Sequence, residues 1–288
     1  MVDMRRKFEN RDDLIAYVRE QFPDAEAINA QVAELRGGRK AAEQQMRKAS
    51  YGTEYSHTRN AIDGKVSRLS AYLRYGVLSL NEVREYALTH AGKRFEAEKF
   101  VNELAWRDYF QRVYREKGAD IWTDIEAYKT GFAPHEYADG LPADIQAGQT
   151  GVCFIDDFIA ELYQTGYLHN HARMWLAAYV VHWRRVKWQA GARWFLMHLL
   201  DGDPASNNLS WQWVASTFST KPYYYTLENV LKYTGERYQG EPRDFGHEAF
   251  VGSYEQMAQR LFPHVDLTES SEYDASKSKQ GRDRKGRR

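Results

Sequence analysis

The stretch HARMWLAAYVVHWRR (residues 171–185) is apolar on nearly every side of a helix, and ARWFLMHLL (residues 192–200) repeats that character. Helices of this kind lie at the centre of a large core rather than at its surface. We find no convincing alternation of apolar and polar residues of the kind that marks a half-buried strand, and no Asn-Gly or similar turn between two apolar runs. The sequence therefore predicts an all-α fold.

Amphipathic patterns on the N-terminal side of this centre predict further helices. Ser79 with Glu82 three residues later has the form of a capping box. Gly92, Gly118 and Gly166 follow apolar-periodic stretches and are typical helix ends. The predicted helices are DDLIAYVREQF (12–22), GGRKAAEQQMRKA (37–49), LSLNEVREYALTHAG (78–92), RFEAEKFVNELAWRDYFQRVYREKG (94–118) and FIDDFIAELYQTG (154–166).

Two segments lack a helical pattern. Residues 123–150 carry Pro134 and Pro142 and predict a long surface connection that is functional or mobile. The last stretch, SKSKQGRDRKGRR, has the composition of a disordered tail, either merely solvated or in contact with nucleic acid. We therefore expect an N-terminal helical extension at 1–50, one helical domain at 51–270 and a basic disordered tail at 271–288.

Composition excludes several classes of site. The chain has 288 residues, with 40 basic and 40 acidic side chains, so overall charge predicts no polyanionic partner. The single cysteine, Cys153, excludes an intramolecular disulfide, a four-thiolate iron–sulfur cluster and a multi-cysteine zinc site, and we expect no metal. No apolar run reaches the roughly 18 residues of a membrane span. The N-terminus lacks the apolar core of a secretory signal, so a cytoplasmic protein is expected.

The stretch DGDPASNNLSWQW (residues 201–213) places small polar side chains directly before two tryptophans. On a helix, Trp211 and Trp213 point about 200° apart, because each residue turns the chain by about 100°. One is expected to face the interior and the other a surface or cavity. No GxGxxG turn and no phosphate-loop lysine motif is present, which excludes a Rossmann-type nucleotide site. The residues alone indicate a helical protein with a polar pocket walled by aromatics.

Four motifs in a fixed order carry a family resemblance. They are KVSRLSAYLRYGVLS (65–79), NELAWRDYF (102–110), TGYLHNHARM (165–174) and DGDPASNNLSWQW (201–213). Together they resemble the flavin-binding helical domain of the photolyase/cryptochrome family, over roughly residues 50–225. That resemblance implies FAD as cofactor. The usual family member carries an α/β antenna domain before this one, whereas about fifty residues precede the motifs here, so no antenna chromophore is expected.

The resemblance implies a set of FAD-binding residues. Asn207 takes the position that faces the flavin N5 atom, where an amide can meet the nitrogen with or without a proton. Arg173 and Asp201 resemble an ion pair beside the isoalloxazine ring, and Asp203 resembles the acid that accepts a hydrogen bond from ring N3–H. Further cofactor contacts are implied for Tyr55, Ser67, Arg68, Leu69, Ser70, Arg107 and Asn170.

The same resemblance implies electron donors and a substrate cavity. Trp211 resembles the first donor to excited flavin and Trp188 the second, while Trp122, Trp183, Trp194 and several tyrosines are candidates for a third. The implied substrate-binding residues are Glu103, Trp106, His171, Met174 and Trp213, and the implied catalytic residues are Glu103, Asn207, Trp188 and Trp211. Apolar walls replace the stacking that an extruded base loses.

Three functions remain open at this point. The first is light-driven repair of cyclobutane pyrimidine dimers by excited reduced FAD, with damaged DNA as partner and a single strand as one alternative form of it. His171 stands where many photolyases have an arginine that touches DNA, and Tyr225 replaces another arginine. These two departures from the family pattern are expected to lower the affinity for DNA. The second is a cryptochrome-like blue-light receptor that signals through flavin photoreduction to an unidentified partner. The third is a helical binding module that has lost its flavin.

Overall fold

The computed structural model describes residues 4–23, 33–240 and 242–266. The chain divides into two units, Met1–Val32 and Ala33–Arg288. Over the described residues no strand forms, and one isolated bridge joins Ala138 and Val186. The all-α prediction is confirmed. None of the described helices has the length and apolar character needed to cross a bilayer.

The first unit contains the helix α1 (Arg11–Gln21). Asn10 caps it by accepting a hydrogen bond from the Asp13 amide. Arg5 forms an ion pair with Asp13 and lies over the ring of Phe8, with its Cζ 4.8 Å from the centroid. None of the α1 side chains is buried, so these local contacts, rather than a core, hold this unit in shape.

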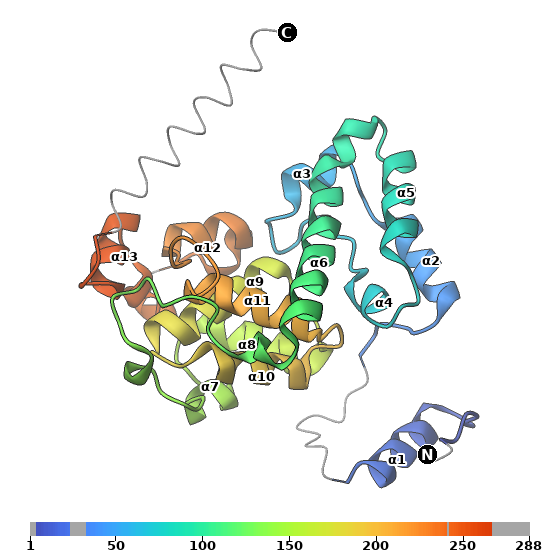
Figure 1. The fold of residues 1–288 in the computed structure, drawn as a ribbon, viewed down its shortest axis with the longest axis horizontal. Helices are drawn as coiled ribbons and strands as arrows, with labels where there is room; N and C mark the ends of the chain where they lie inside the picture. Colours follow the sequence, from blue (N-terminus) through green and yellow to red (C-terminus); the bar gives the residue numbers. More distant parts are fainter. Residues whose placement is uncertain (1–3, 24–32, 241, 267–288) are drawn as a thin grey trace, which may run out of the picture. The chain divides into compact units, whose positions relative to one another are not determined.

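The second unit has two apolar cores with α6 (Glu98–Lys117) between them (Figure 1). One core is built by α2 (Arg39–Lys48), α3 (Thr53–Thr58), α4 (Ser70–Arg74), α5 (Leu80–His90) and α6. The other is built mainly by α8 (Cys153–Thr165), α9 (Asn170–Ala178), α10 (Trp188–His198) and α11 (Pro204–Ala215), with α7 (Ala143–Ala147) and α12 (Leu227–Thr234) beside them. The last described helix is α13 (Tyr254–Leu261). Because α6 packs against both α5 and α11, it connects the two cores.

The structure confirms the predicted signals for the start and the end of two helices. Ser79 and Glu82 form the capping box at the start of α5. Gly166 ends α8 with a φ of +63°. A Cβ at residue 166 would lie 2.7 Å from Cγ of Leu200, so both the conformation and the space favour glycine.

The structure differs from the predicted helix boundaries at two places. Residues 94–97 form a 3₁₀ turn before α6. The apolar stretch 171–185 is α-helical only as far as Ala178 and then forms one π turn, Tyr179–Trp183, in which the Arg184 amide donates to the Tyr179 carbonyl. Arg185 follows with a φ of +49°. The change of hydrogen-bond register ends the helix two residues earlier than its apolar pattern suggests.

The domain boundary and the 123–150 segment also differ from expectation. Ala42 and Met46 of α2 are buried in the same core as Tyr51 and Tyr55, so the boundary between units lies at Val32 and not at residue 50. Within 123–150, Tyr137 and Ile145 are buried, and backbone bonds link Ala138 to Arg185 and Lys187. This segment is therefore a docked part of the second unit. The predicted tail at 271–288 lies outside the described residues.

Candidate functional site

Arg173 of α9 and Asp201, just before α11, form a largely buried ion pair. Nη2 of Arg173 lies 2.9 Å from Oδ2 of Asp201, whose side chain is 6% exposed. Burial alone would raise the pKa of the Asp201 carboxyl, but the charge of Arg173 and its hydrogen bond outweigh that effect and lower the pKa. Oδ1 of Asp201 is buried and has no hydrogen-bond partner within the described part of the chain. That oxygen is available to a donor on a bound group.

Asp203 joins the start of α11 to α6. It caps α11, and its Oδ2 accepts from the Ser206 amide at 3.2 Å and the Ser206 hydroxyl at 2.7 Å. The same oxygen accepts from Arg107 at 3.2 Å and from Gln111 at 2.6 Å. All four bonds go to Oδ2, so Oδ1 is the oxygen that remains for a ligand. The bonds fix the carboxylate in place before any ligand arrives.

Two guanidinium groups lie over the ring of Tyr167. Cζ of Arg68 is 4.9 Å from the ring centroid and Cζ of Arg173 is 5.7 Å from it. Arg173 is paired with Asp201, whereas Arg68 forms no ion pair within the described residues. Arg68 has a φ of +52° in the loop that leads to α4, where Leu69 is buried and Ser67 and Ser70 are half-buried. The loop thus presents hydroxyls and one guanidinium that has no direct ion pair among the described residues, which suit phosphate groups.

The two tryptophans of α11 face opposite environments, as their spacing predicts. Trp211 is 2% exposed and packs edge-on against Phe195 of α10, with the centroids 5.0 Å apart, while Trp213 is 42% exposed. The indole N–H of Trp211 is buried without a partner among the described residues. Asn207, one turn before Trp211, donates from Nδ2 to the Ala192 carbonyl at 3.0 Å and to the Asn208 side chain at 3.1 Å.

Trp188 lies at the start of α10 and is fully buried. Its ring stacks on Trp122 with centroids 6.3 Å apart and planes 6° from parallel. Its Nε1–H donates to Oδ1 of Asp124 at 2.6 Å. The other two tryptophan candidates for a third donor lie elsewhere, because Trp183 packs on Tyr225 and Phe250, and Trp194 packs on Phe195 and Tyr163.

The predicted substrate residues lie at the surface of α6, α9 and α11. Trp106 is 54% exposed, and Glu103, one turn earlier, forms an ion pair with Arg59. Met174 accepts a hydrogen bond at sulfur from Asn170 at 3.5 Å. The two indoles and the Glu103 carboxylate, whose side chain is 43% exposed, are therefore accessible to a ligand.

His171 and Tyr55 make packing contacts. The His171 ring stacks on Trp175 with the centroids 4.8 Å apart, and its Nδ1 lies 2.8 Å from the Asn60 carbonyl oxygen. Burial lowers the pKa of His171. Tyr55 is 7% exposed, and burial raises the pKa of its hydroxyl, with a smaller contribution from the charge of Glu103. Contacts of these two residues with substrate or cofactor remain predictions.

Comparison with known proteins identifies the family of this chain. A model described as the FAD-binding domain of DNA photolyase matches residues 100–242. The deoxyribodipyrimidine photo-lyase of Streptomyces griseus is 34% identical over 200 residues, which cover 68% of this chain and 43% of that protein. The enzyme of the same name from Escherichia coli is 31% identical over 203 residues, covering 65% and 40%. The chain belongs to the photolyase/cryptochrome family.

Solved structures of this family show the same fold. The cryptochrome of Synechocystis sp. PCC6803 aligns with a TM-score of 0.61 and 21% identity, covering 85% of this chain and 52% of that one. A class III photolyase from Agrobacterium tumefaciens aligns with a TM-score of 0.59, also at 21% identity, covering 94% and 60%. The chain spans about two fifths of the length of the curated relatives it matches.

Several residues that contact the predicted site residues were not predicted from the sequence. Gln111 lies four residues after Arg107 and so on the same face of α6, a spacing that could have identified it. Tyr167 lies inside one of the quoted motifs, but no local pattern indicates that two guanidinium groups lie over its ring. Arg59 and Asp124 reach Glu103 and Trp188 only through the fold, and no local pattern points to them.

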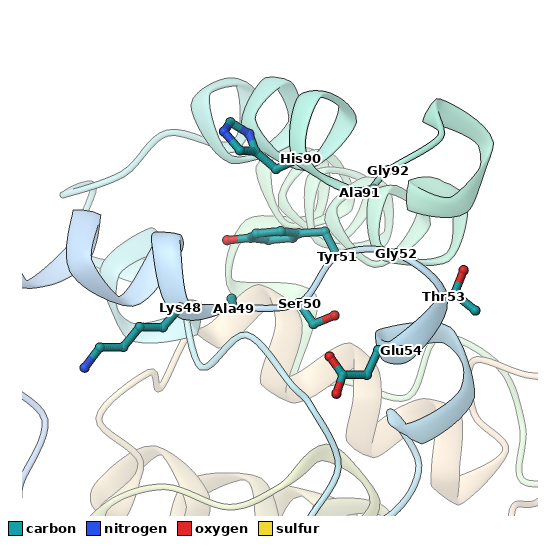
Figure 2. A pocket seen from close by; sticks show the side chains of 10 residues that line it. All are labelled: Lys48, Ala49, Ser50, Tyr51, Gly52, Thr53, Glu54, His90, Ala91 and Gly92. Carbon is teal, nitrogen blue, oxygen red and sulfur yellow. The ribbon is translucent and has the colours of Figure 1, made fainter.

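One hollow on this photolyase-like domain lies apart from the predicted site. It has a volume of about 410 Å³ and is lined by residues 48–54 and 90–92 (Figure 2). Tyr51, which lines it, donates its hydroxyl to the Met46 carbonyl at 2.7 Å, and His90 stacks on Tyr86 with centroids 3.8 Å apart. None of the predicted site residues lines this hollow.

Proposed function

We propose that residues 33–266 bind FAD and that the protein uses it for light-driven repair of cyclobutane pyrimidine dimers in DNA. The observation that carries this proposal is the free, buried Oδ1 of Asp201 beside a fixed guanidinium. A buried acceptor without a donor costs about 1–3 kcal/mol. A flavin ring, which has both donors and acceptors at its edge, would remove that cost.

The residues present fit FAD in further respects. Asp203 keeps Oδ1 for a ring N–H while four donors hold its other oxygen. Arg68, Ser67 and Ser70 would contact the pyrophosphate and ribityl chain, and the unpaired charge of Arg68 matches a phosphate. Trp211, with its own N–H unpartnered, lies in the interior as an electron donor. When bound and reduced, FAD supplies the electron that splits the dimer ring and is then returned.

The exposed indoles supply the walls for the damaged bases. Trp106 and Trp213 are 54% and 42% exposed although indoles are usually well covered. Stacking on an aromatic side chain stabilises a bound base by roughly 1–3 kcal/mol, and two such walls offset an unstacking cost of a few kcal/mol. Glu103 would contact the polar edge of the bases in exchange for part of its ion pair with Arg59.

Ion pairing of three arginines on or beside α6 favours a single strand as substrate. Arg59, Arg107 and Arg112 each form an ion pair with a carboxylate, which is Glu103, Asp203 or Asp108. Duplex affinity rises with the number of phosphates that free cations neutralise. Paired arginines contribute little to that number, so stacking supplies a larger share of the binding free energy.

Repair of a dimer-containing oligonucleotide under blue light with added reductant tests this function. We expect repair of a single strand to exceed repair of the matching duplex. The variants Trp106→Ala, Trp213→Ala and Glu103→Ala should lose repair while keeping bound flavin and the wild-type melting temperature. Met197→Ala, at a methionine that is 70% exposed on α10, is the matched surface control and should repair normally. A flavin-loaded protein that repairs neither strand form would contradict the proposal.

A blue-light receptor is the second candidate function. The stack of Trp188 on Trp122 favours it, because indoles in addition to Trp211 suit photoreduction of flavin. In that case flavin photoreduction would be efficient, repair would be absent on both strand forms, and light would change binding of a protein partner. A colourless protein that stays colourless when FAD is added would contradict both functions.

A further inference from the structure

The stacked indoles of Trp188 and Trp122 lie in opposite electrostatic surroundings. The N–H of Trp188 donates to the carboxylate of Asp124 at 2.6 Å. The ring of Trp122 lies under the guanidinium of Arg193, with Cζ 5.0 Å from the centroid. Arg193 is exposed and forms no ion pair with a described residue, so its charge is not neutralised by a neighbouring carboxylate. The two rings are near-parallel, but one adjoins an anion and the other a cation.

This arrangement determines where a positive charge on the pair is most stable. An anion at hydrogen-bond distance stabilises a radical cation on Trp188, whereas a cation above the ring opposes one on Trp122. The resting cation–π contact of Arg193 with Trp122 would also be lost when that ring becomes positive. A charge that reaches the pair therefore remains on Trp188, which is fully buried, instead of moving outward to the half-buried Trp122.

The surroundings of Asp124 hold its carboxylate in place beside the indole N–H of Trp188. Its Oδ1 takes hydrogen bonds from Nε1 of Trp188 and from Nε2 of Gln189, at 2.6 and 3.2 Å. The next residue, Ile125, donates its amide to Oε1 of Gln212 at 3.0 Å, and Gln212 also donates to the Ile121 carbonyl at 3.3 Å. These bonds fix the 121–125 segment on α11, so the short contact to Trp188 is preorganised.

We propose that Asp124 is the proton acceptor for oxidised Trp188 and that Arg193 prevents the charge from moving to Trp122. The inference rests on the proposed flavin site, which supplies the oxidant, a photoexcited oxidised flavin. Trp211 gives one electron to that flavin, and Trp188 gives one electron to Trp211. The Nε1 proton of the resulting Trp188 radical cation then passes to Oδ1 of Asp124. This leaves a neutral indolyl radical and a neutral carboxylic acid, with the flavin reduced by one electron.

A flavin-free measurement tests the contact itself. In protein labelled with ¹⁵N-tryptophan and free of FAD, the Trp188 indole N–H should give a strongly downfield proton signal, assigned by its loss in Trp188→Phe. In Asp124→Asn, which keeps the shape of the side chain and removes its charge, that signal should move upfield. An unchanged signal in a variant that retains the wild-type melting temperature overturns the proposal.

Transient absorption of the FAD-loaded protein then tests the proton transfer. In Asp124→Asn, the cationic tryptophan radical should persist at least about tenfold longer than in wild type before it becomes neutral. Unaltered deprotonation in this variant overturns the role of Asp124 but leaves the flavin site standing. A wild-type protein that forms no tryptophan radical after a flash overturns the electron donors of the flavin site as well.

Arg193→Gln provides a second, surface variant. Removal of the guanidinium should let the charge reach Trp122, so that added ascorbate removes the radical at least about tenfold faster than in wild type. An unchanged rate overturns the role of Arg193. Because Arg193 is exposed, its replacement should leave the fold intact, and the melting temperature checks this directly.

Discussion

Gly191 of α10 lies directly against the indole of Trp211 in α11. A Cβ at residue 191 would lie 2.2 Å from Cη2 and 2.4 Å from Cζ3 of that ring. The missing side chain therefore sets how closely α10 approaches α11 and holds the Trp211 ring in one position.

Gly191→Ala should consequently destabilise the protein. We expect the free energy of unfolding to fall by about 1–3 kcal/mol, because a buried ring must move to admit a methyl group. Urea unfolding measures this change. Gly140→Ala, where an added Cβ has no neighbour within 4 Å, is the matched control and should leave stability nearly unchanged. Equal effects of the two substitutions would contradict the close contact.

Asp201→Asn should lower stability by about 2–3 kcal/mol at pH 7. This is somewhat below the 3–5 kcal/mol typical of breaking a fully buried ion pair, because the Arg173 side chain is 24% exposed. Asp139→Asn removes the carboxylate of an ion pair in which Asp139 is 89% exposed, and it should have almost no effect. Thermal unfolding at pH 7 compares the two variants.

The effect of Asp201→Asn should also depend on pH. The pKa of Asp201 is lower in the folded protein than in the unfolded chain, so its stabilisation is present above the unfolded pKa of about 3.9 and is lost as pH falls through the folded pKa. The difference between wild type and variant should therefore shrink at the acid end of the stable range. A difference that does not change with pH would show that charge is not its cause.

His169 should make stability fall between about pH 6.5 and pH 4. Burial, with a smaller contribution from neighbouring His171, lowers the pKa of His169 to about 4. The unfolded chain, with a histidine pKa near 6.5, binds the proton first as pH falls. The stabilisation is therefore complete above pH 6.5, is lost through this window at up to about 1.4 kcal/mol per pH unit, and changes little below pH 4.

His169→Asn tests this slope. His169 caps α9 by accepting the His171 amide at 3.1 Å, and asparagine can keep that bond. Urea unfolding between pH 7 and pH 4 should show a shallower slope in the variant than in wild type. His57→Asn, at an exposed histidine, is the control for the loss of a surface imidazole. Parallel curves for wild type and His169→Asn would contradict the assignment.

The sequence predicted local features of this fold better than long-range ones. The opposite faces of Trp211 and Trp213 follow from the turn per residue alone. The Ser79 capping box and the helix end at Gly166 depend only on neighbours within a few residues. The pairing of Arg173 with Asp201 needed the family resemblance, because the two residues are 28 positions apart in the chain.

The features that were missed depend on distant contacts. The helical pattern of α2 predicts a helix but not the core in which Ala42 and Met46 are buried. Residues 123–150 appear irregular because their order comes from the Ala138–Val186 bridge and from Tyr137, which no local periodicity encodes. The contacts of Glu103 with Arg59 and of Trp188 with Asp124 are likewise set by the assembled helices.

Tyr225 and Tyr137 are both buried, but only one of their hydroxyls has a partner. Tyr225 is fully buried and stacks on Phe250 with the centroids 5.5 Å apart, and its hydroxyl has no hydrogen bond within the described residues. Tyr137 is 3% exposed and its hydroxyl lies 2.7 Å from the hydroxyl of Thr130. The position where the family resemblance leads one to expect an arginine thus holds a core aromatic side chain.

The two tyrosine-to-phenylalanine variants should therefore differ in sign. Tyr225→Phe removes an unsatisfied buried hydroxyl, so we expect stability to stay the same or to rise by up to about 1 kcal/mol. Tyr137→Phe leaves the buried Thr130 hydroxyl without its partner and should cost about 1–2 kcal/mol. Urea unfolding of the two variants under one condition makes the comparison. A loss of stability in Tyr225→Phe as large as that in Tyr137→Phe would mean that the Tyr225 hydroxyl has a partner, such as a buried water.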